Sequence, residues 1–223
     1  MQQEALKPGT VAVWDLPTRL FHWSLVGLIG FSWWSAETGA MDWHRLSGLT
    51  VTALIIFRLI WGLIGGSTAR FASFVRAPQH VIAHLRGQGG EHAGHNPLGG
   101  YSVIALLLLI VVQVGTGLFA VDTDGLESGP LSYLVSFEEG RIASGVHEIA
   151  FALLQLLIVV HIAAILFYRF VKRRNLVKPM ITGSDGELTS SAGALVAAPW
   201  WRFPLAAGIA AAFAWWTAGG MML

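Results

Sequence analysis

Five stretches of this chain are apolar over about twenty residues each, which is the length that an α-helix needs to cross a bilayer. Hydrocarbon offers the backbone no hydrogen-bond partner, so such a segment folds as a helix that pairs its own amides. The composition agrees, because 54% of the residues are hydrophobic and 12% are charged, against about a quarter charged in soluble domains. The sequence therefore predicts an all-α integral membrane protein whose spans cover roughly residues 18–38, 45–66, 99–121, 143–169 and 202–222.

The charges of the loops predict the orientation of these helices. We expect the first stretch to be a retained helix rather than a signal peptide, because it lacks a small-residue cleavage site. Lys and Arg gather on the cytoplasmic side of membranes, which places the N-terminus in the cytoplasm and the end of the fifth span outside. The basic side holds Lys7, Arg19, Arg70, Arg76, Arg86, Arg169, Lys172, Arg173, Arg174 and Lys178, and the other side has only Arg45 and Arg141. The outer loops are acidic, which suits either a basic soluble partner or an ordinary solvated loop.

Histidines inside the apolar stretches are the most informative residues for function. His147 and His161 lie fourteen positions apart in one stretch, which puts them on one helix face about 21 Å apart. If successive spans alternate in direction, His44 lies at the depth of His147, and His22 lies at the depth of His161. Four histidines then form two level-matched pairs. Such pairs predict two bis-histidine haem sites, one near each side of the membrane.

Two other interpretations of these histidines remain open. A histidine in a membrane helix is often a hydrogen-bonded packing residue, and a haem-free transporter or assembly subunit uses histidines to relay protons. The chain contains no cysteine, which excludes iron–sulfur clusters, thiol redox chemistry and covalently attached c-type haem. Any haem is therefore held non-covalently.

Three arginines are candidates for contact with haem propionates. Arg58 follows His44 by fourteen residues, so it shares that histidine's helix face but lies at the depth of the inner haem. A buried guanidinium needs an anion, although Arg58 also has the option of extending to the cytoplasmic headgroups. Arg19 and Arg45 are weaker candidates. Four glycines, Gly48, Gly115, Gly117 and Gly145, would let a flat porphyrin approach the helix backbone.

The long loop between the second and third spans carries the other four histidines, His80, His84, His92 and His95. His80 and His84 have the spacing of a helical metal site, but no carboxylate completes a zinc-protease signature. The segment is more typical of an interfacial amphipathic helix, with Phe74 and Ile82 among the residues that face lipid. Residues 182–193 are rich in Gly, Ser and Thr and predict a flexible connection to the fifth span.

Several motifs, in this order, resemble the prokaryotic cytochrome b-561 family, which includes the b-type cytochrome subunit of membrane-bound nickel-iron hydrogenases. They are VWDLPTRLFHW (13–23), WHRLSGL (43–49), FRLIWGLIGG (57–66), GHNPLGGYSVIALLLLIVVQVGTGLFA (94–120), HEIAFALLQLLIVVHIAA (147–164) and NLVKPMITG (175–183). The resemblance implies a four-helix core that holds two b haems between His22 and His161 and between His44 and His147. It also implies a domain over residues 1–183, followed by a linker and fifth helix over 184–223 that depart from the family core.

The resemblance further implies a function in the bacterial cytoplasmic membrane. The chain would move electrons between the quinone pool and a periplasmic partner, such as a c-type cytochrome or a hydrogenase subunit. It would act as an electron-transfer protein or as the cytochrome subunit of an oxidoreductase complex. A superoxide:quinone oxidoreductase is the alternative within redox chemistry.

Overall fold

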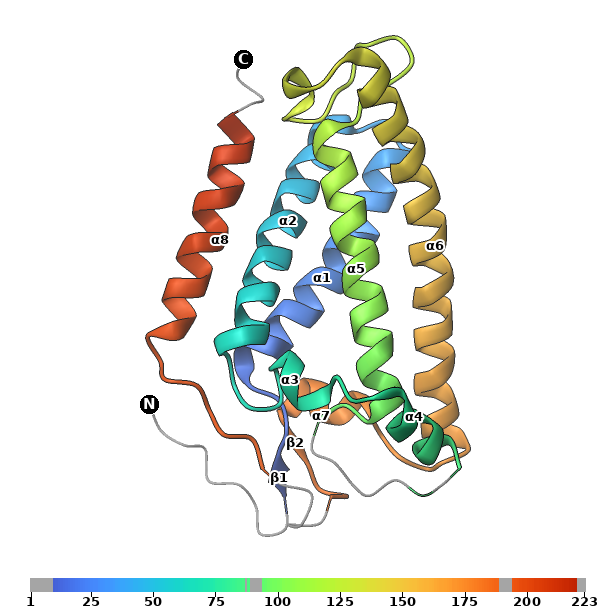
Figure 1. The fold of residues 1–223 in the computed structure, drawn as a ribbon, viewed down its shortest axis with the longest axis vertical. Coiled ribbons are helices and arrows are strands. Elements are labelled where there is room, and N and C mark those ends of the chain that lie inside the picture. The colour runs from blue at the N-terminus through green and yellow to red at the C-terminus, as the bar shows by residue number, and fades with distance from the viewer. Residues whose placement is uncertain (1–9, 87, 89–93, 189–193, 220–223) are drawn as a thin grey trace. The chain divides into compact units, whose positions relative to one another are not determined.

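A computed structural model describes residues 10–86, 88, 94–188 and 194–219, and its elements are almost all helical (Figure 1). The long helices are α1 (Leu16–Glu37), α2 (Met41–Ile64), α5 (Pro97–Phe119), α6 (Phe137–Phe170) and α8 (Arg202–Gly219). The short elements are β1 (Val11–Ala12), α3 (Phe71–Phe74), α4 (Pro78–Leu85), the 3₁₀ turn η1 (Ser132–Leu134), α7 (Val177–Thr182) and β2 (Ser184–Asp185).

Polar side chains cap the starts of three long helices. Asp15 accepts a hydrogen bond from the amide of Thr18 at 2.9 Å, and Asn96 accepts one from the amide of Gly99 at 2.7 Å. Ser136 and Glu139 form a reciprocal pair, in which each side chain accepts a bond from the other residue's amide. These bonds satisfy amides that have no partner within the helix. The caps therefore define where α1, α5 and α6 begin.

Among the described residues, three helices are long and apolar enough to cross a membrane, namely α2, α5 and α6. In the most apolar part of each of these helices, 50%, 17% and 11% of the residues, respectively, are buried by the rest of the chain. A soluble protein does not leave long apolar helices this exposed to water, whereas lipid covers such surfaces without cost. The chain is therefore a multi-pass membrane protein, as the sequence predicts.

Helices also form at the first and fifth predicted spans, as α1 and α8. Neither α1 nor α8 is as apolar as those three helices, because tryptophans and small or polar residues lower the mean hydropathy of both. The small residues of α8 are buried instead, since Ala206, Ala210 and Thr217 are at most 3% exposed. The predicted arrangement of four core spans plus one remains a prediction, as does the division of the chain after residue 183.

The chain divides into two compact units, each described by itself. The first, the strand unit, comprises Met1–Leu20, Ile60–Ile104 and Val160–Phe203. In it β1 pairs with β2 in antiparallel register, and Val11, Val13, Trp14 and Leu188 form a buried cluster. Asp15 accepts a hydrogen bond from the Trp61 indole at 3.0 Å, and the carbonyl of Gly183 accepts the amides of Val13 and Trp14. These contacts attach the start of α1 to the segment that follows α7.

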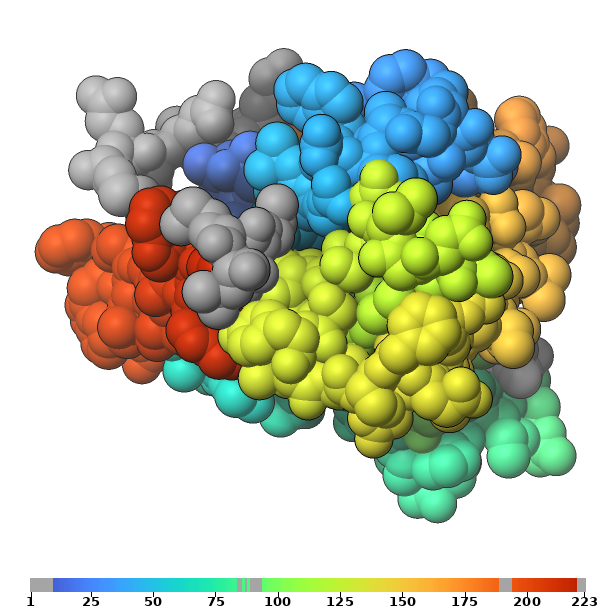
Figure 2. All heavy atoms as spheres, turned by 90° about the horizontal axis from the view of Figure 1, so that it is seen from above, coloured from blue at the N-terminus to red at the C-terminus, as the bar shows by residue number. Residues whose placement is uncertain are grey.

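The second unit, the cavity unit, comprises Phe21–Leu59, Ala105–Val159 and Pro204–Leu223. One of its buried clusters joins Leu49 of α2, Leu118 of α5 and Leu131, with Ala218 of α8 packed against it. Figure 2 views the face on which the turn between α1 and α2 and the segment between α5 and α6 lie at the surface. Gly39, in the left-handed conformation at φ 70°, ends α1 and allows this turn.

The loop between α2 and α5 differs from the single amphipathic helix that the sequence predicts. It forms two short helices, α3 and α4, separated before Pro78, because a proline disfavours helical geometry in the residue before it. Ile82 is 50% exposed, as expected. The prediction that Phe74 faces lipid is wrong, since Phe74 is 2% exposed and packs against His95 with ring centroids 4.7 Å apart.

Candidate functional site

His44 of α2 and His147 of α6 face each other within the cavity unit. Their ring centroids are 6.1 Å apart and the ring planes are at 82°. Two imidazoles bound on opposite sides of one metal, with metal–nitrogen bonds of about 2 Å, place their centroids about 6 Å apart. The observed separation therefore fits an axial pair on a single iron.

Hydrogen bonds hold the His147 ring from α5. The Nδ1 atom lies 2.9 Å from the backbone carbonyl of Gln113 and 3.5 Å from the Thr116 hydroxyl. A carbonyl only accepts, so Nδ1 carries the proton and Nε2 carries the lone pair. The Gln113 side-chain amide lies 2.9 Å from that Nε2 atom. His147 is thus held in the tautomer that a metal ligand requires.

The His44 ring is held in the same way from α1. Its Nδ1 atom lies 2.9 Å from the backbone carbonyl of Ser32 and 3.3 Å from the Ser32 hydroxyl. The proton again lies on Nδ1, which leaves the Nε2 lone pair for a ligand. Both rings therefore offer a metal-binding nitrogen, and each is oriented by a carbonyl from a neighbouring helix.

A cavity of about 410 Å³ surrounds the two histidines, within the range of small-molecule and cofactor sites. Its walls come from α1, α2, α5, α6 and the segment after α5, and they are mainly apolar. A side chain at Gly117 would meet the His147 ring, because a Cβ atom there would lie 2.9 Å from its Cε1 atom. A Cβ atom at Gly48 would meet nothing within 4 Å. The lining includes Ile29, Trp33, Val51, Ile110, Val114, Phe151 and Leu154.

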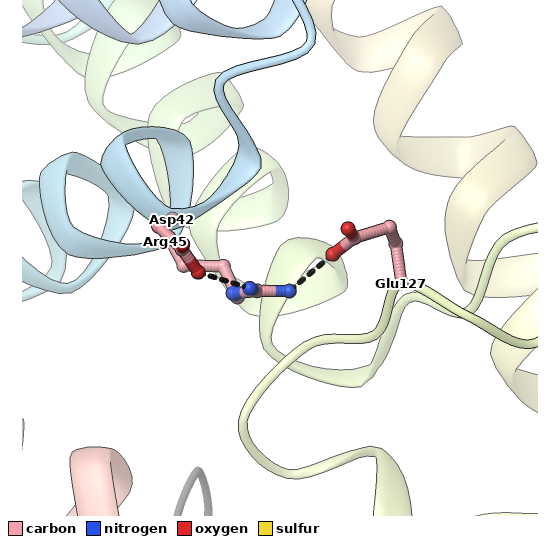
Figure 3. Close-up of polar contacts among 3 residues, drawn as sticks. All are labelled: Asp42, Arg45 and Glu127. Carbon is pink, nitrogen blue, oxygen red and sulfur yellow. Dashed lines mark hydrogen bonds and ion pairs between the residues drawn. The ribbon is translucent and has the colours of Figure 1, made fainter.

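Three charged residues also line the cavity, namely Glu37, Arg45 and Glu148. The Arg45 guanidinium forms ion pairs with Asp42, on its own helix, and with Glu127, in the segment between α5 and α6 (Figure 3). Arg45 is therefore placed at the cavity, as its sequence position next to His44 suggests. Its observed partners are the two carboxylates.

The other predicted ligands, His22 and His161, lie in α1 and α6 and are partly buried. His22 belongs to the cavity unit and His161 to the strand unit. Their pairing therefore stays a prediction from depth and helix face. The ring of His22 packs edge-on against Trp23, with centroids 5.0 Å apart.

The two remaining arginine candidates differ in their surroundings. Arg58 is 3% exposed and lies in the last two turns of α2, whereas Arg19 donates a hydrogen bond to the Ile181 carbonyl at 2.5 Å. Among the loop histidines, His80 is exposed and His95 packs against Trp14 and Phe74. The side chain of His84 and the whole of His92 lie outside what the structure describes.

Sequence reasoning missed the residues that orient the site. Ser32 and Gln113 contribute backbone carbonyls, and because every residue has one, the sequence does not indicate which carbonyls orient the histidines. The Gln113 side chain does indicate a buried polar contact. It is a lone amide in the apolar run from Val103 to Val114, where an unpaired polar group is costly. Glu127 lies in one of the acidic outer loops, and nothing in the sequence distinguishes it from the other acidic residues there.

Comparison with protein families finds a match over most of the chain. The model described as prokaryotic cytochrome b561 matches residues 13–183. This range includes the four predicted haem histidines and the residues that orient His44 and His147, and it ends before α8. Comparisons with curated proteins and with solved structures find no match.

Proposed function

Because the chain belongs to the prokaryotic cytochrome b561 family, we propose that it is a di-haem membrane cytochrome. It transfers electrons between the quinone pool and a periplasmic redox partner, such as a c-type cytochrome or a hydrogenase subunit. The observation that carries this proposal is the pair of His44 and His147, whose Nδ1 protons are donated to carbonyls and whose Nε2 atoms are unprotonated. The Gln113 side-chain amide, which donates to the Nε2 atom of His147, would give way to the iron.

The outer haem, in this proposal, is bound between His44 and His147. The carbonyls of Ser32 and Gln113 fix the tautomer and the rotation of the two rings, so the rings themselves would need little reorganisation when iron binds. The Gln113 side chain would have to leave the His147 Nε2 atom. The walls are mainly apolar, Gly48 leaves open space beside the backbone of α2, and Gly117 leaves room for the His147 ring. A bis-imidazole haem supplies a one-electron couple without an open coordination position, which suits electron transfer.

The inner haem is proposed to lie between His22 and His161. Two arguments support this pairing. The spacing of fourteen residues puts His161 on the same helix face as His147, and the alternating direction of successive spans puts His22 at the depth of His161. We assign Arg58 to a propionate of this haem, because its place on α2 puts it at that depth and its side chain is 3% exposed. This burial favours the propionate over an extended contact with headgroups.

The proposed topology has four core spans, α1, α2, α5 and α6, with α8 as a fifth. The N-terminus lies in the cytoplasm and the C-terminus in the periplasm, according to the distribution of Lys and Arg. His44 and His147 then belong to the periplasmic side, where the acidic residues of the outer loops suit a basic partner. The buried small face of α8 supports a role in helix packing.

Quinol added to membranes that contain the complex should reduce both haems, and a periplasmic acceptor should then reoxidise them through the outer haem. The two proposed haem positions lie about 21 Å apart, measured along α6 from His147 to His161. In a His147→Ala chain we expect at least a tenfold slower exchange with the acceptor, because the outer site is lost, while the inner haem stays reducible by quinol. Stopped-flow absorbance of the haem bands measures both steps.

For the native chain, the required sample is membranes with the natural partner present and both haems spectroscopically verified. A chain in which neither quinol reduction nor quinone-dependent reoxidation is detected under these conditions is not a quinone-linked conduit. An unaltered rate of exchange in the His147→Ala chain would instead exclude the outer site from the electron path.

A further inference from the structure

Arg45 carries the positive charge nearest to His44 in the chain, and two carboxylates hold it. The guanidinium lines the cavity, its Nη2 atom pairs with Asp42, and its Nη1 atom pairs with Glu127 (Figure 3). Asp42 lies one turn earlier on α2, whereas Glu127 reaches Arg45 from a segment more than eighty residues later. The position of the guanidinium therefore depends on a tertiary contact.

The two carboxylates differ in their exposure. The Asp42 side chain is 92% exposed, that of Glu127 is 40% exposed, and that of Arg45 is 23% exposed. An ion pair with a fully solvated carboxylate contributes little, because water screens it. The pair with Glu127 is better shielded, so it determines where the guanidinium lies. Without it, Arg45 would follow Asp42 toward the solvent.

The segment that carries Glu127 is firmly attached to the ends of α5 and α6. The Glu127 carbonyl accepts the Asp122 amide at 3.0 Å, and Val121 forms a β-bridge with Ser128. The amides of Gly129 and Leu131 donate to the carbonyls of Ala120 and Leu118 at 2.7 and 2.8 Å. A carboxylate on this framework has a defined position relative to the cavity.

We propose that Glu127 is a positioning residue that holds the Arg45 guanidinium at the cavity and thereby sets the reduction potential of the outer haem. The inference rests on the proposed haem between His44 and His147. Reduction removes one positive charge from the iron, so a nearby cation favours the reduced state. A unit charge at ~10 Å, with an effective dielectric constant of ~20, changes such an equilibrium roughly tenfold.

The direction in which the reduction potential of the outer haem changes distinguishes a positioning role of Glu127 from a direct effect of its charge. Loss of a carboxylate charge alone favours the reduced haem and raises the potential. Loss of Glu127 also lets Arg45 move away from the cavity, which lowers the potential. We expect the second effect to dominate, so that Glu127→Gln shifts the outer-haem reduction equilibrium about three- to tenfold toward the oxidised form.

Three variants test this inference by spectroelectrochemical titration of the full chain in detergent. Asp124→Asn is the matched control, because Asp124 is exposed on the same segment and is not an ion-pair partner of Arg45. It removes the same charge and should leave the potential unchanged or slightly raised. Glu127→Asp keeps the charge but shortens the reach, so it should lower the potential. In an Arg45→Gln background, Glu127→Gln should no longer lower it.

Equal shifts for Glu127→Gln and Asp124→Asn, in the same direction, would overturn the inference. So would an unchanged potential in Glu127→Asp, or an equally large fall in the Arg45→Gln background. The haem content of every variant is measured first. A native chain without haem contradicts the proposed function. If every variant binds two haems but Glu127→Gln and Asp124→Asn shift the outer-haem potential in the same direction, only the role of Glu127 is contradicted.

Discussion

A chain in which His147 is replaced by alanine is expected to retain one haem of two, and the lost haem should be the one that His44→Ala also removes. The two imidazoles face each other at 6.1 Å, so either substitution leaves a single axial ligand in an apolar cavity. His22→Ala and His161→Ala should remove the other haem and leave the outer signal largely intact. Haem content per chain and low-temperature absorbance spectra separate the two sites.

The control for these variants is His80→Ala, because His80 is an exposed residue of α4 and its loss should leave two haems. Removal of the same haem by His22→Ala and His147→Ala would show that the depth assignment is wrong. Different haems lost in His44→Ala and His147→Ala would contradict the outer site itself.

Gly117→Ala is expected to destabilise the outer haem although it adds a single methyl group. Its Cβ atom would lie 2.9 Å from Cε1 and 3.1 Å from Nδ1 of His147, which is closer than unstrained contact permits. The ring is held by the Gln113 carbonyl, so it must tilt and lose that bond, or the helices must separate. Strain of this kind costs about 1–3 kcal/mol, equivalent to a site that is weaker by a factor of about 5 to 160.

Gly115→Ala is the matched control for this substitution. Both glycines lie in α5, and replacement of either by alanine raises helix propensity equally, but a Cβ atom at Gly115 meets nothing within 4 Å. The measurement is the rate at which the outer haem is lost to an excess of a haem-scavenging protein. We expect acceleration in Gly117→Ala only, and equal rates in the two variants would show that Gly117 has no steric role beside His147.

Much of the fold could be predicted because membrane helices are governed by local pattern. Apolar runs of sufficient length must form helices in lipid, and helices form at all five predicted positions. The proximity of His44 and His147 could also be anticipated, because helix periodicity and alternating spans place them at one depth. Haem ligation itself stays a prediction that the variants above will test.

The parts that could not be predicted depend on contacts between distant segments. The carbonyls of Ser32 and Gln113 orient the histidines through the backbone, and a backbone group is the same at every position. Glu127 reaches Arg45 only because the segment after α5 folds back onto the ends of α5 and α6. Phe74 was expected in lipid because its own segment is amphipathic, whereas the neighbouring His95 and the start of α5 bury it.

The haem content of the purified native chain tests the central claim most directly. Two level-matched histidine pairs provide axial ligands for two non-covalently bound b haems, so pyridine extraction should give two haems b per chain. The optical spectrum should be that of low-spin, bis-histidine iron, unchanged by carbon monoxide because no coordination position is open. A chain with one haem or none, or a spectrum that carbon monoxide alters, would contradict the account.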